Sequence, residues 1–307
     1  MTKMKTIFAV IFLALLIPVL LKAPESEAKV YRGKCKSNLT WSYDSKTKTM
    51  VIDCKGDMPD DEQFYDLDMG WRKYYFKTKK VILKKGISSI GAGAFYNFQK
   101  LEEVVLPEGL RIIKYDAFDG CRKLQFINKP STLEVIEKDV FWDVKIKSIS
   151  LKNLKKLGSE CFSGAKLQSV DIPAKCKIED SVFWSCKKLK KVTFEKGVKR
   201  ISYGMFRETG IKNIDIPGSV AQIGTYAFAN CQSLKKAIIN EGVKKISKDA
   251  FSNTALEEIT IPSTVTELGK NAFRWESTEK SSLKKVVIRS KNIKKWGTMV
   301  FGATRDD

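Results

Sequence analysis

The sequence predicts a strand-rich solenoid of about ten stacked coils with one parallel sheet, preceded by a small β-hairpin module. Two columns of apolar residues repeat in phase, with a step of 21 to 23 residues until the last repeat. The aromatic column contains Phe95, Phe118, Phe141, Phe162, Phe183, Phe206, Phe228, Phe251, Phe273 and Phe301. The leading column contains Leu101, Leu124, Ile146, Leu167, Leu189, Ile211, Leu234, Leu256 and Leu283. Because the two columns keep the same step, we interpret each repeat as one coil.

Each coil is expected to begin with a short strand that has one buried face. Apolar residues lie three and five positions after the leading residue, as Val170 and Ile172 do after Leu167, and this period of two is typical of a half-buried strand. Proline follows several of these segments, where its missing N–H ends the hydrogen-bond ladder: Pro107, Pro130, Pro173, Pro217 and Pro262. The rest of each coil is predicted to be a compact 3₁₀ or helical return segment.

The N-terminal residues predict a secretory signal peptide. Lys3 and Lys5 precede an apolar run at 7–21, and Ser26 and Ala28 supply the small residues of a cleavage site near Ala28. This run is shorter than the roughly 20 residues that span a bilayer, although an uncleaved anchor stays open as the alternative. We therefore expect a secreted, extracellular or cell-surface protein with no transmembrane segment in the mature chain. The predicted divisions are 1–28, the signal peptide; 29–77, the hairpin capping module and acidic linker; and 78–307, the repeat array.

The seven cysteines divide into two groups by position. Five fall on or beside the inward columns and are predicted to be small core residues: Cys121, Cys161, Cys176, Cys186 and Cys231. Cys35 and Cys54 instead flank the predicted hairpin, so they form a candidate disulfide for an exported protein. Two unbridged thiols remain the alternative.

The residue types argue against an enzyme. The chain contains no histidine, which excludes Ser-His-Asp and Cys-His nucleophiles and histidine-ligated zinc. An acidic stretch could gather a hard cation, but it has no defined ligand spacing, and we expect it to be a solvated linker: Asp57, Asp60, Asp61, Glu62, Asp66 and Asp68. We expect no catalytic residue, no cofactor and no metal site.

The net charge of +21 directs attention to exposed lysines at the strand starts. Lys190, Lys212 and Lys235 are expected in adjacent coils about 5 Å apart, where like charges repel unless an anionic partner lies across them. The alternative is that lysine only keeps exposed strands from pairing with other chains. The candidate partner-binding residues are Lys147, Lys190, Lys191, Lys212, Asn213, Asp215, Lys235, Lys236 and Lys284.

The repeats resemble the BspA-like leucine-rich repeat family, whose recurrent phrase corresponds here to Ser-Ile-Gly-Ala-Gly-Ala-Phe at 89–95. Upstream, residues 33–35, Trp41 and 56–58 resemble the hairpin module that precedes these repeats in bacterial surface proteins. Cys54 departs from this pattern, because the family usually has glycine there. The resemblance implies a leucine-rich repeat solenoid, α/β by convention, and a secreted or surface-exposed binding protein without catalytic residues. It also implies that some relatives are adhesins for host matrix proteins or other cells.

Two functions remain in competition at this level. In the first, the array is an adhesin-like protein that binds extracellular or cell-surface proteins through its outward sheet face and coil edges. In the second, the lysines bind anionic polymers such as wall teichoic acid, glycosaminoglycan or extracellular DNA. Binding to a polymer of this kind falls steeply with salt concentration, so ionic strength separates the two. Neither function requires a small-molecule substrate.

Overall fold

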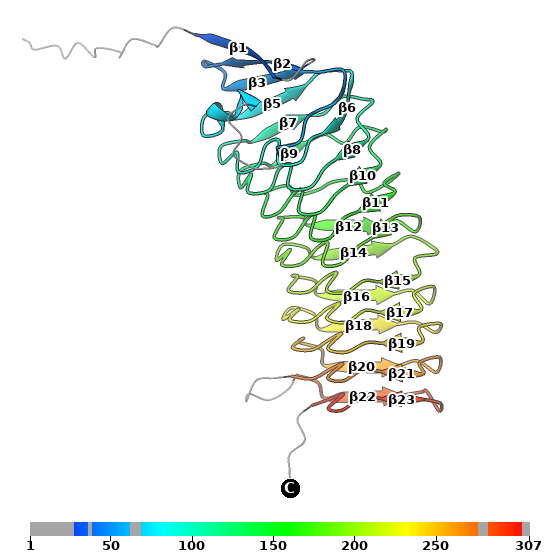
Figure 1. Cartoon of the computed structure of the whole chain (residues 1–307). Helices are drawn as coiled ribbons and strands as arrows, with labels where there is room; N and C mark the ends of the chain where they lie inside the picture. The colour runs from blue at the N-terminus through cyan, green and yellow to red at the C-terminus, as the bar shows by residue number, and fades with distance from the viewer. Residues whose placement is uncertain (1–27, 36–38, 62–68, 276–281, 303–307) are drawn as a thin grey trace, which may run out of the picture.

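The computed structural model of the chain describes residues 28–35, 39–61, 69–275 and 282–302. Coils of similar outline stack on one another from the N-terminal hairpin to the last described coil (Figure 1). The predicted solenoid is therefore confirmed. The predicted signal peptide lies, apart from Ala28, outside the described residues.

One row of parallel strands follows the pattern predicted from the apolar period. Strand ends agree with the proline positions, since β12 and β16 stop at Ile172 and Ile216, directly before proline. The coil containing Ile149 forms no strand in this row. The row consists of β5 (Lys80–Leu83), β7 (Glu103–Val105), β9 (Phe126–Ile127), β12 (Ser169–Ile172), β14 (Lys191–Phe194), β16 (Asn213–Ile216), β18 (Lys236–Ile239), β20 (Glu258–Ile261) and β22 (Lys285–Ile288).

A second row of parallel strands occupies the segment predicted to be a 3₁₀ or helical return. Most of its strands are two residues long, so the solenoid has two strand-bearing sides instead of one sheet. A two-residue strand is too short to show a period of two in the sequence. The row consists of β4 (Gly56–Asp57), β6 (Ile87–Ile90), β8 (Ile112–Ile113), β10 (Val135–Ile136), β11 (Lys156–Leu157), β13 (Lys177–Ile178), β15 (Arg200–Ile201), β17 (Gln222–Ile223), β19 (Lys245–Ile246), β21 (Glu267–Leu268) and β23 (Lys295–Trp296).

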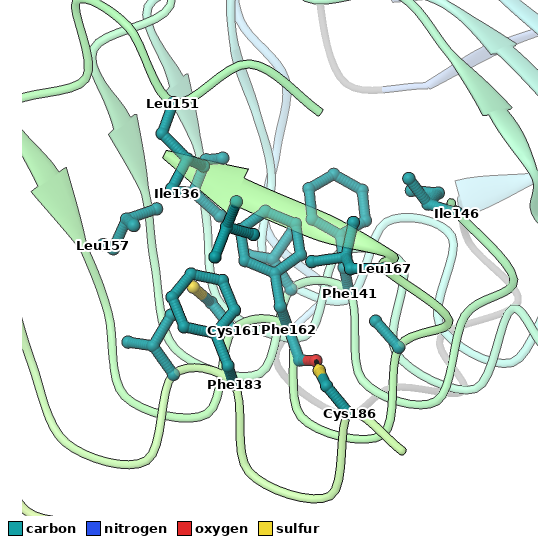
Figure 2. Packing of buried hydrophobic residues seen from close by; sticks show 14 of the residues in the cluster. Ile136, Phe141, Ile146, Leu151, Leu157, Cys161, Phe162, Leu167, Phe183 and Cys186 are labelled. Carbon is teal, nitrogen blue, oxygen red and sulfur yellow. Dashed lines mark hydrogen bonds between the residues drawn. The ribbon is translucent and has the colours of Figure 1, made fainter. Parts of the chain in front are cut away.

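The phenylalanine column forms the centre of the core. From Phe95 to Phe301 each ring stacks on the ring of the next coil, with centroids 5.1 to 6.0 Å apart. Figure 2 shows Phe141, Phe162 and Phe183 in this stack, with Leu and Ile side chains packed beside them. Ten stacked rings give nine turns of the solenoid, and no coil buries its phenylalanine alone.

Two tight backbone reversals carry the chain around each phenylalanine. Residues two positions before and two positions after the ring have positive φ, as Asp116 and Gly120 do around Phe118. Glycine, asparagine and aspartate tolerate this left-handed conformation best. Glutamate, serine, methionine and tyrosine also occupy such positions, and Tyr226, with φ of 56°, is the bulkiest of them.

Buried thiols support the coil-to-coil contacts. The Sγ atoms of Cys121, Cys186 and Cys231 each donate to the carbonyl oxygen of the phenylalanine in the preceding coil, at 3.2, 3.0 and 3.0 Å. Cys161 is also fully buried. These cysteines are core residues, as predicted, but Cys176 is partly exposed.

The N-terminal module continues the sheet of the array. Strands β1 (Val30–Cys35), β2 (Leu39–Asp44) and β3 (Thr49–Asp53) pair antiparallel, and β3 then pairs parallel with β5. The 3₁₀ turn η2 (Arg72–Tyr74) follows Trp71, whose Nε1 donates to the Ala94 carbonyl at 3.1 Å. The module therefore covers the first coil with both backbone and aromatic contacts.

The predicted bridge between Cys35 and Cys54 is not formed, and that prediction is corrected. Cys35 pairs with Leu39 across β1 and β2, while Thr40 pairs with Asp53 across β2 and β3, so strand β2 lies between the two cysteines. Two strand spacings amount to about 9.6 Å. A disulfide joins Cα atoms no more than about 7 Å apart. The Cys35 thiol instead lies 3.8 Å from Met69 Sδ.

Both strand rows are interrupted near the middle of the array. Within the described residues 69–275, no pairing joins β14 to β16 in the first row or β13 to β15 in the second. The coils remain bonded on the phenylalanine side, where the Ser181 and Phe183 amides donate to the carbonyls of Tyr203 and Met205 at 2.8 and 3.1 Å. The second row is thus divided into two ladders. The first row is divided into three, because the coil containing Ile149 also separates β9 from β12.

Candidate binding surface on the outward sheet face

The outward face of the first strand row is formed by alternate residues of each strand. On β12, β16 and β18 the burial pattern alternates exposed and buried. Because parallel strands are in register, outward side chains line up in columns that run along the array. The character of these columns changes from the N-terminal to the C-terminal end.

The N-terminal part of this face carries an apolar patch, which we define as Val51, Ile82, Val105 and Phe126. Val51 pairs with Ile82 and Ile82 with Val105, so the three aliphatic side chains form one row across β3, β5 and β7. Phe126 on β9 has 61% of its surface exposed and pairs with Glu103, so it lies diagonally from Val105 in the neighbouring outward column. An exposed phenylalanine beside an aliphatic row is the type of surface that partner proteins cover.

Ion pairs border the apolar patch. Lys80 Nζ lies 2.8 Å from Glu103 Oε1 next to Phe126, and Lys84 Nζ lies 3.3 Å from Asp53 Oδ2 beside Val51. These charges are solvent-exposed, so each pair contributes little to stability. The result is an apolar centre with a polar rim, which is the usual arrangement of a protein interface.

The middle of the face carries small polar side chains. Ser148 and Ser150 precede Ser169 and Asp171 on the next coil, and all four are exposed. Thr193 Oγ1 donates a short hydrogen bond to Asp171 Oδ1. This part of the face separates the apolar patch from Lys212, Lys235 and Lys236.

All nine predicted partner-binding residues are exposed, and the strand ladder that carries them is interrupted between β14 and β16. The Lys235 amide donates to the Lys212 carbonyl at 2.9 Å, so these two residues occupy adjacent coils as expected. The Lys190 amide donates to the Gln168 carbonyl in the preceding coil. The break between β14 and β16 therefore lies between Lys190 and Lys212. Lys190 therefore belongs to a different ladder.

Acidic residues alternate with the lysines in the C-terminal half. Lys236 pairs with Glu258 in register, and Glu258 pairs with Lys285. Lys235 Nζ lies 3.9 Å from Glu257 Oε1. The repulsion expected between stacked lysines is thus relieved in part by carboxylates of the same chain.

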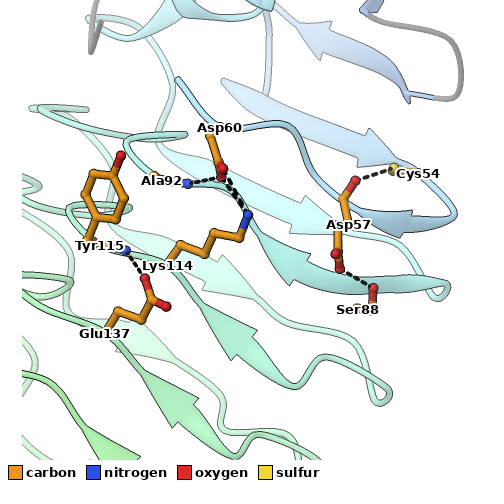
Figure 3. A network of polar contacts seen from close by, with 8 residues as sticks. All are labelled: Cys54, Asp57, Asp60, Ser88, Ala92, Lys114, Tyr115 and Glu137. Carbon is orange, nitrogen blue, oxygen red and sulfur yellow. Dashed lines mark hydrogen bonds and ion pairs between the residues drawn. The ribbon is translucent and has the colours of Figure 1, made fainter. Parts of the chain in front are cut away.

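The acidic linker is held against the array instead of standing free in solvent. Figure 3 shows Asp60 accepting from Lys114 Nζ at 2.9 Å and from the Ala92 amide at 2.9 Å, and Asp57 accepting from Ser88 Oγ at 2.6 Å. The hydrogen bond from Ser88 lowers the pKa of Asp57, and that to Asp60 raises the pKa of Lys114. Glu62, Asp66 and Asp68 lie outside the described residues.

Carboxyl groups also gather near the positive-φ turns of neighbouring coils. Burial, with a smaller contribution from Asp139, raises the pKa of Asp116 to about 6. Burial and the nearby Asp116 raise the pKa of Asp119 to about 7. Part of this group is therefore protonated near neutral pH, which lessens its repulsion.

The structure offers neither a metal centre nor a membrane span in the part of the chain that it describes. No group of three or more metal-binding side chains comes together among those residues. Helices long and apolar enough to cross a bilayer are likewise lacking there.

The apolar patch is the feature that the sequence-based prediction missed. Its signal was present, since Phe126 directly precedes Ile127 and so occupies an outward strand position. Its neighbours Val51 and Ile82 became recognisable only with the strand register, because they come from the module and the first coil.

The nine-turn stack of parallel strands, with a core of stacked phenylalanines, defines a solenoid-type repeat protein. The model of the BspA type leucine rich repeat region matches residues 73–190 and 156–280, with six copies. The chain belongs to this family. Membership suggests a binding role and a secreted or cell-surface location.

Solved structures show the same fold. A leucine-rich repeat protein from Bacteroides ovatus is 24% identical with a TM-score of 0.67, over 86% of this chain and 67% of that chain. One from Eubacterium ventriosum is 20% identical with a TM-score of 0.64, over 86% of this chain and 73% of that chain. A search of curated proteins found no match.

Proposed function

We propose that this protein is a secreted or cell-surface binding protein, adhesin-like in its role, that engages a protein partner through the outward sheet face. The single observation that supports this most is the apolar patch with Phe126 at its edge, 61% exposed. A phenylalanine in solvent is a poor contributor to folding stability and a good anchor for a partner, since burying it removes a large apolar area from water. The flanking ion pairs supply the rim.

The patch also has a fixed geometry. Val51, Ile82 and Val105 sit on three consecutive hydrogen-bonded strands, and the module's aromatic core supports β3 from beneath, where Tyr43 stacks on Tyr74 at 4.3 Å. A surface on rigid strands loses little conformational entropy when a partner binds. This favours a specific protein contact over a general adhesive surface.

Replacing Phe126 by serine is expected to weaken binding to the protein partner at least tenfold, because an aromatic anchor carries much of the energy of such an interface. The measurement is a binding curve for the mature chain on purified extracellular matrix proteins and on proteins from the producing cell's surface. Trp142→Ser is the matched control, since Trp142 is 43% exposed but lies outside the patch, one residue after the core Phe141. Equal binding by the Phe126→Ser and wild-type chains would show that the patch is not the contact.

Binding to anionic polymers is the second candidate function. The observation that favours it is the exposure of every predicted lysine, with a net chain charge of +21. The alternating carboxylates Glu257 and Glu258 weaken the positive field in the C-terminal half. For this reason we place the protein partner first.

Changing Lys190, Lys212 and Lys235 together to glutamate is expected to abolish retention on heparin or purified cell wall, if polyanions are the ligand. Retention of the wild type should fall log-linearly with salt concentration and be lost by about 0.5 M. The charge-matched control changes three other exposed lysines to glutamate, namely Lys55, Lys85 and Lys196. Each of them lies two residues after the end of a strand, β3, β5 or β14. Wild-type retention that survives the salt, or unchanged retention of the lysine-row variant, would reject this second function.

A further inference from the structure

The solenoid core is open to solvent at one coil. An inward residue at the corner between the two strand rows is buried in every other coil from 110 to 265, with 0 to 5% of its surface exposed: Leu110, Leu133, Leu154, Val198, Val220, Val243 and Val265. Cys176 holds this position in the coil of β12 and β13 and is partly exposed. Ile178 is also partly exposed, whereas its counterparts Leu157 and Ile201 are 0% and 1% exposed.

The opening lies where a six-residue corner is followed by a seven-residue corner. The inward strand residue Ile172 is followed six positions later by Ile178, but Phe194 in the next coil is followed seven positions later by Ile201. At this change of corner length β13 does not pair with β15. Ser202 Oγ donates to the Glu179 carbonyl at 2.8 Å beside this unpaired segment. Because cysteine is smaller than the leucine or valine of other coils, it does not fill the gap.

The opening is a cleft of about 380 Å³ with an apolar floor and a basic rim. Ala174, Cys176 and Ile178 line one wall, and Val198, Lys199 and Arg200 line the other. On the rim, Glu179 is paired with Lys156 and Lys177 at 3.2 and 3.5 Å. Lys199 and Arg200 are exposed and make no ion pair with the described residues. The positive charges of these two side chains therefore exceed the negative charge of Asp180, which also lines the cleft.

We propose that this cleft binds a small amphipathic anion, with its apolar chain against Cys176, Ile178 and Val198 and its anionic head at Lys199 and Arg200. The volume lies within the range of small-molecule sites, and the lining has their usual composition of apolar walls with a few polar groups. The site is separate from the outward sheet face, because it opens at the corner between the strand rows. Binding here does not depend on the proposed protein partner.

Cys176 provides a direct readout of occupancy. Among the described cysteines it is the one that is not buried, so a thiol reagent should modify it first. Burial raises the pKa of the Cys176 thiol to about 11, so labelling is best done at pH 9 with excess iodoacetamide. Decanoate below its micellar concentration is the probe. We expect saturating decanoate to slow alkylation of Cys176 about tenfold. Decanol lacks the charge, so the concentration of decanol needed for the same protection should be at least tenfold higher.

Two substitutions at Cys176 separate binding from folding. Bound decanoate should raise the Tm of the wild type. Cys176→Leu places in the cleft a residue type that other coils use at this position, so it should fill the cleft and abolish this rise. Circular dichroism should show that the variant keeps its fold. Cys176→Ala leaves the cleft open and should keep that rise. Lys199→Gln with Arg200→Gln should weaken decanoate binding about tenfold and leave decanol binding unchanged. An unchanged alkylation rate in decanoate, or an equal Tm rise in Cys176→Leu, would overturn the proposal.

Discussion

Phe228→Ala is expected to lower the free energy of unfolding by about 3–5 kcal/mol, measured by urea denaturation. The ring of Phe228 is fully buried and stacks on Phe206 and Phe251, with centroids 5.4 and 5.1 Å apart. Its removal leaves a cavity that neither neighbouring coil can fill, because their own rings are held by the next coils. Hydrogen exchange should increase first in the coils next to Phe228, since contacts in such an array are between nearest neighbours.

The same substitution at Phe126 is the control for this experiment. Phe126 is 61% exposed, so Phe126→Ala removes little buried area and should change the free energy of unfolding by less than about 1 kcal/mol. A loss at Phe126 as large as that at Phe228 would contradict the assignment of one ring to the core and the other to a binding surface.

Arg72→Met is expected to destabilise the protein by about 3–5 kcal/mol, because it leaves the Asp61 carboxylate buried without its cation. Arg72 Nε lies 3.4 Å from Asp61 Oδ2, and the two side chains are 3% and 0% exposed. The Arg72 guanidinium also donates to the carbonyls of Gly93 and Tyr96 at 3.2 and 3.3 Å. This one side chain thus ties the end of the linker to the first coil. Thermal and urea denaturation measure the loss.

Arg122→Met is the matched control. Arg122 Nε lies 3.3 Å from Asp143 Oδ2, but the Arg122 side chain is 70% exposed, so its loss should cost less than about 1 kcal/mol. Combining Asp61→Asn with Arg72→Met should recover part of the stability lost in Arg72→Met, because the double variant no longer buries the negative charge of the Asp61 carboxylate. A double variant no more stable than Arg72→Met would mean that the lost carbonyl contacts, not the ion pair, cause the effect.

The sequence specified the coils because their inward columns repeat with a fixed step. Phe95 to Phe301 mark the stack, and Pro173 and Pro217 mark the strand ends. The second strand row could not be predicted in this way, because most of its strands are two residues long and contribute at most one inward residue, such as Ile223. The Cys35–Cys54 prediction failed because flanking a hairpin in sequence does not place two residues on neighbouring strands.

The candidate surface was predicted less completely than the fold. The lysine positions were recognised as outward, but whether Lys190 continues the row of Lys212 depends on the break between β14 and β16. That break depends on how successive coils pack, which the repeat pattern does not contain. The apolar patch depends on the pairing of β3 with β5, which joins segments outside the repeat pattern to those within it.

The continuity of the N-terminal module with the array has a consequence for how such a protein can change in length. The apolar patch spans β3 to β9 and is therefore fixed to the module, whereas Lys212 and Lys235 lie on coils further along the stack. Duplication or deletion of one whole coil between them would shift the lysines by about 4.8 Å and leave the patch untouched. The number of coils in the array thus sets the distance between two chemically different surfaces.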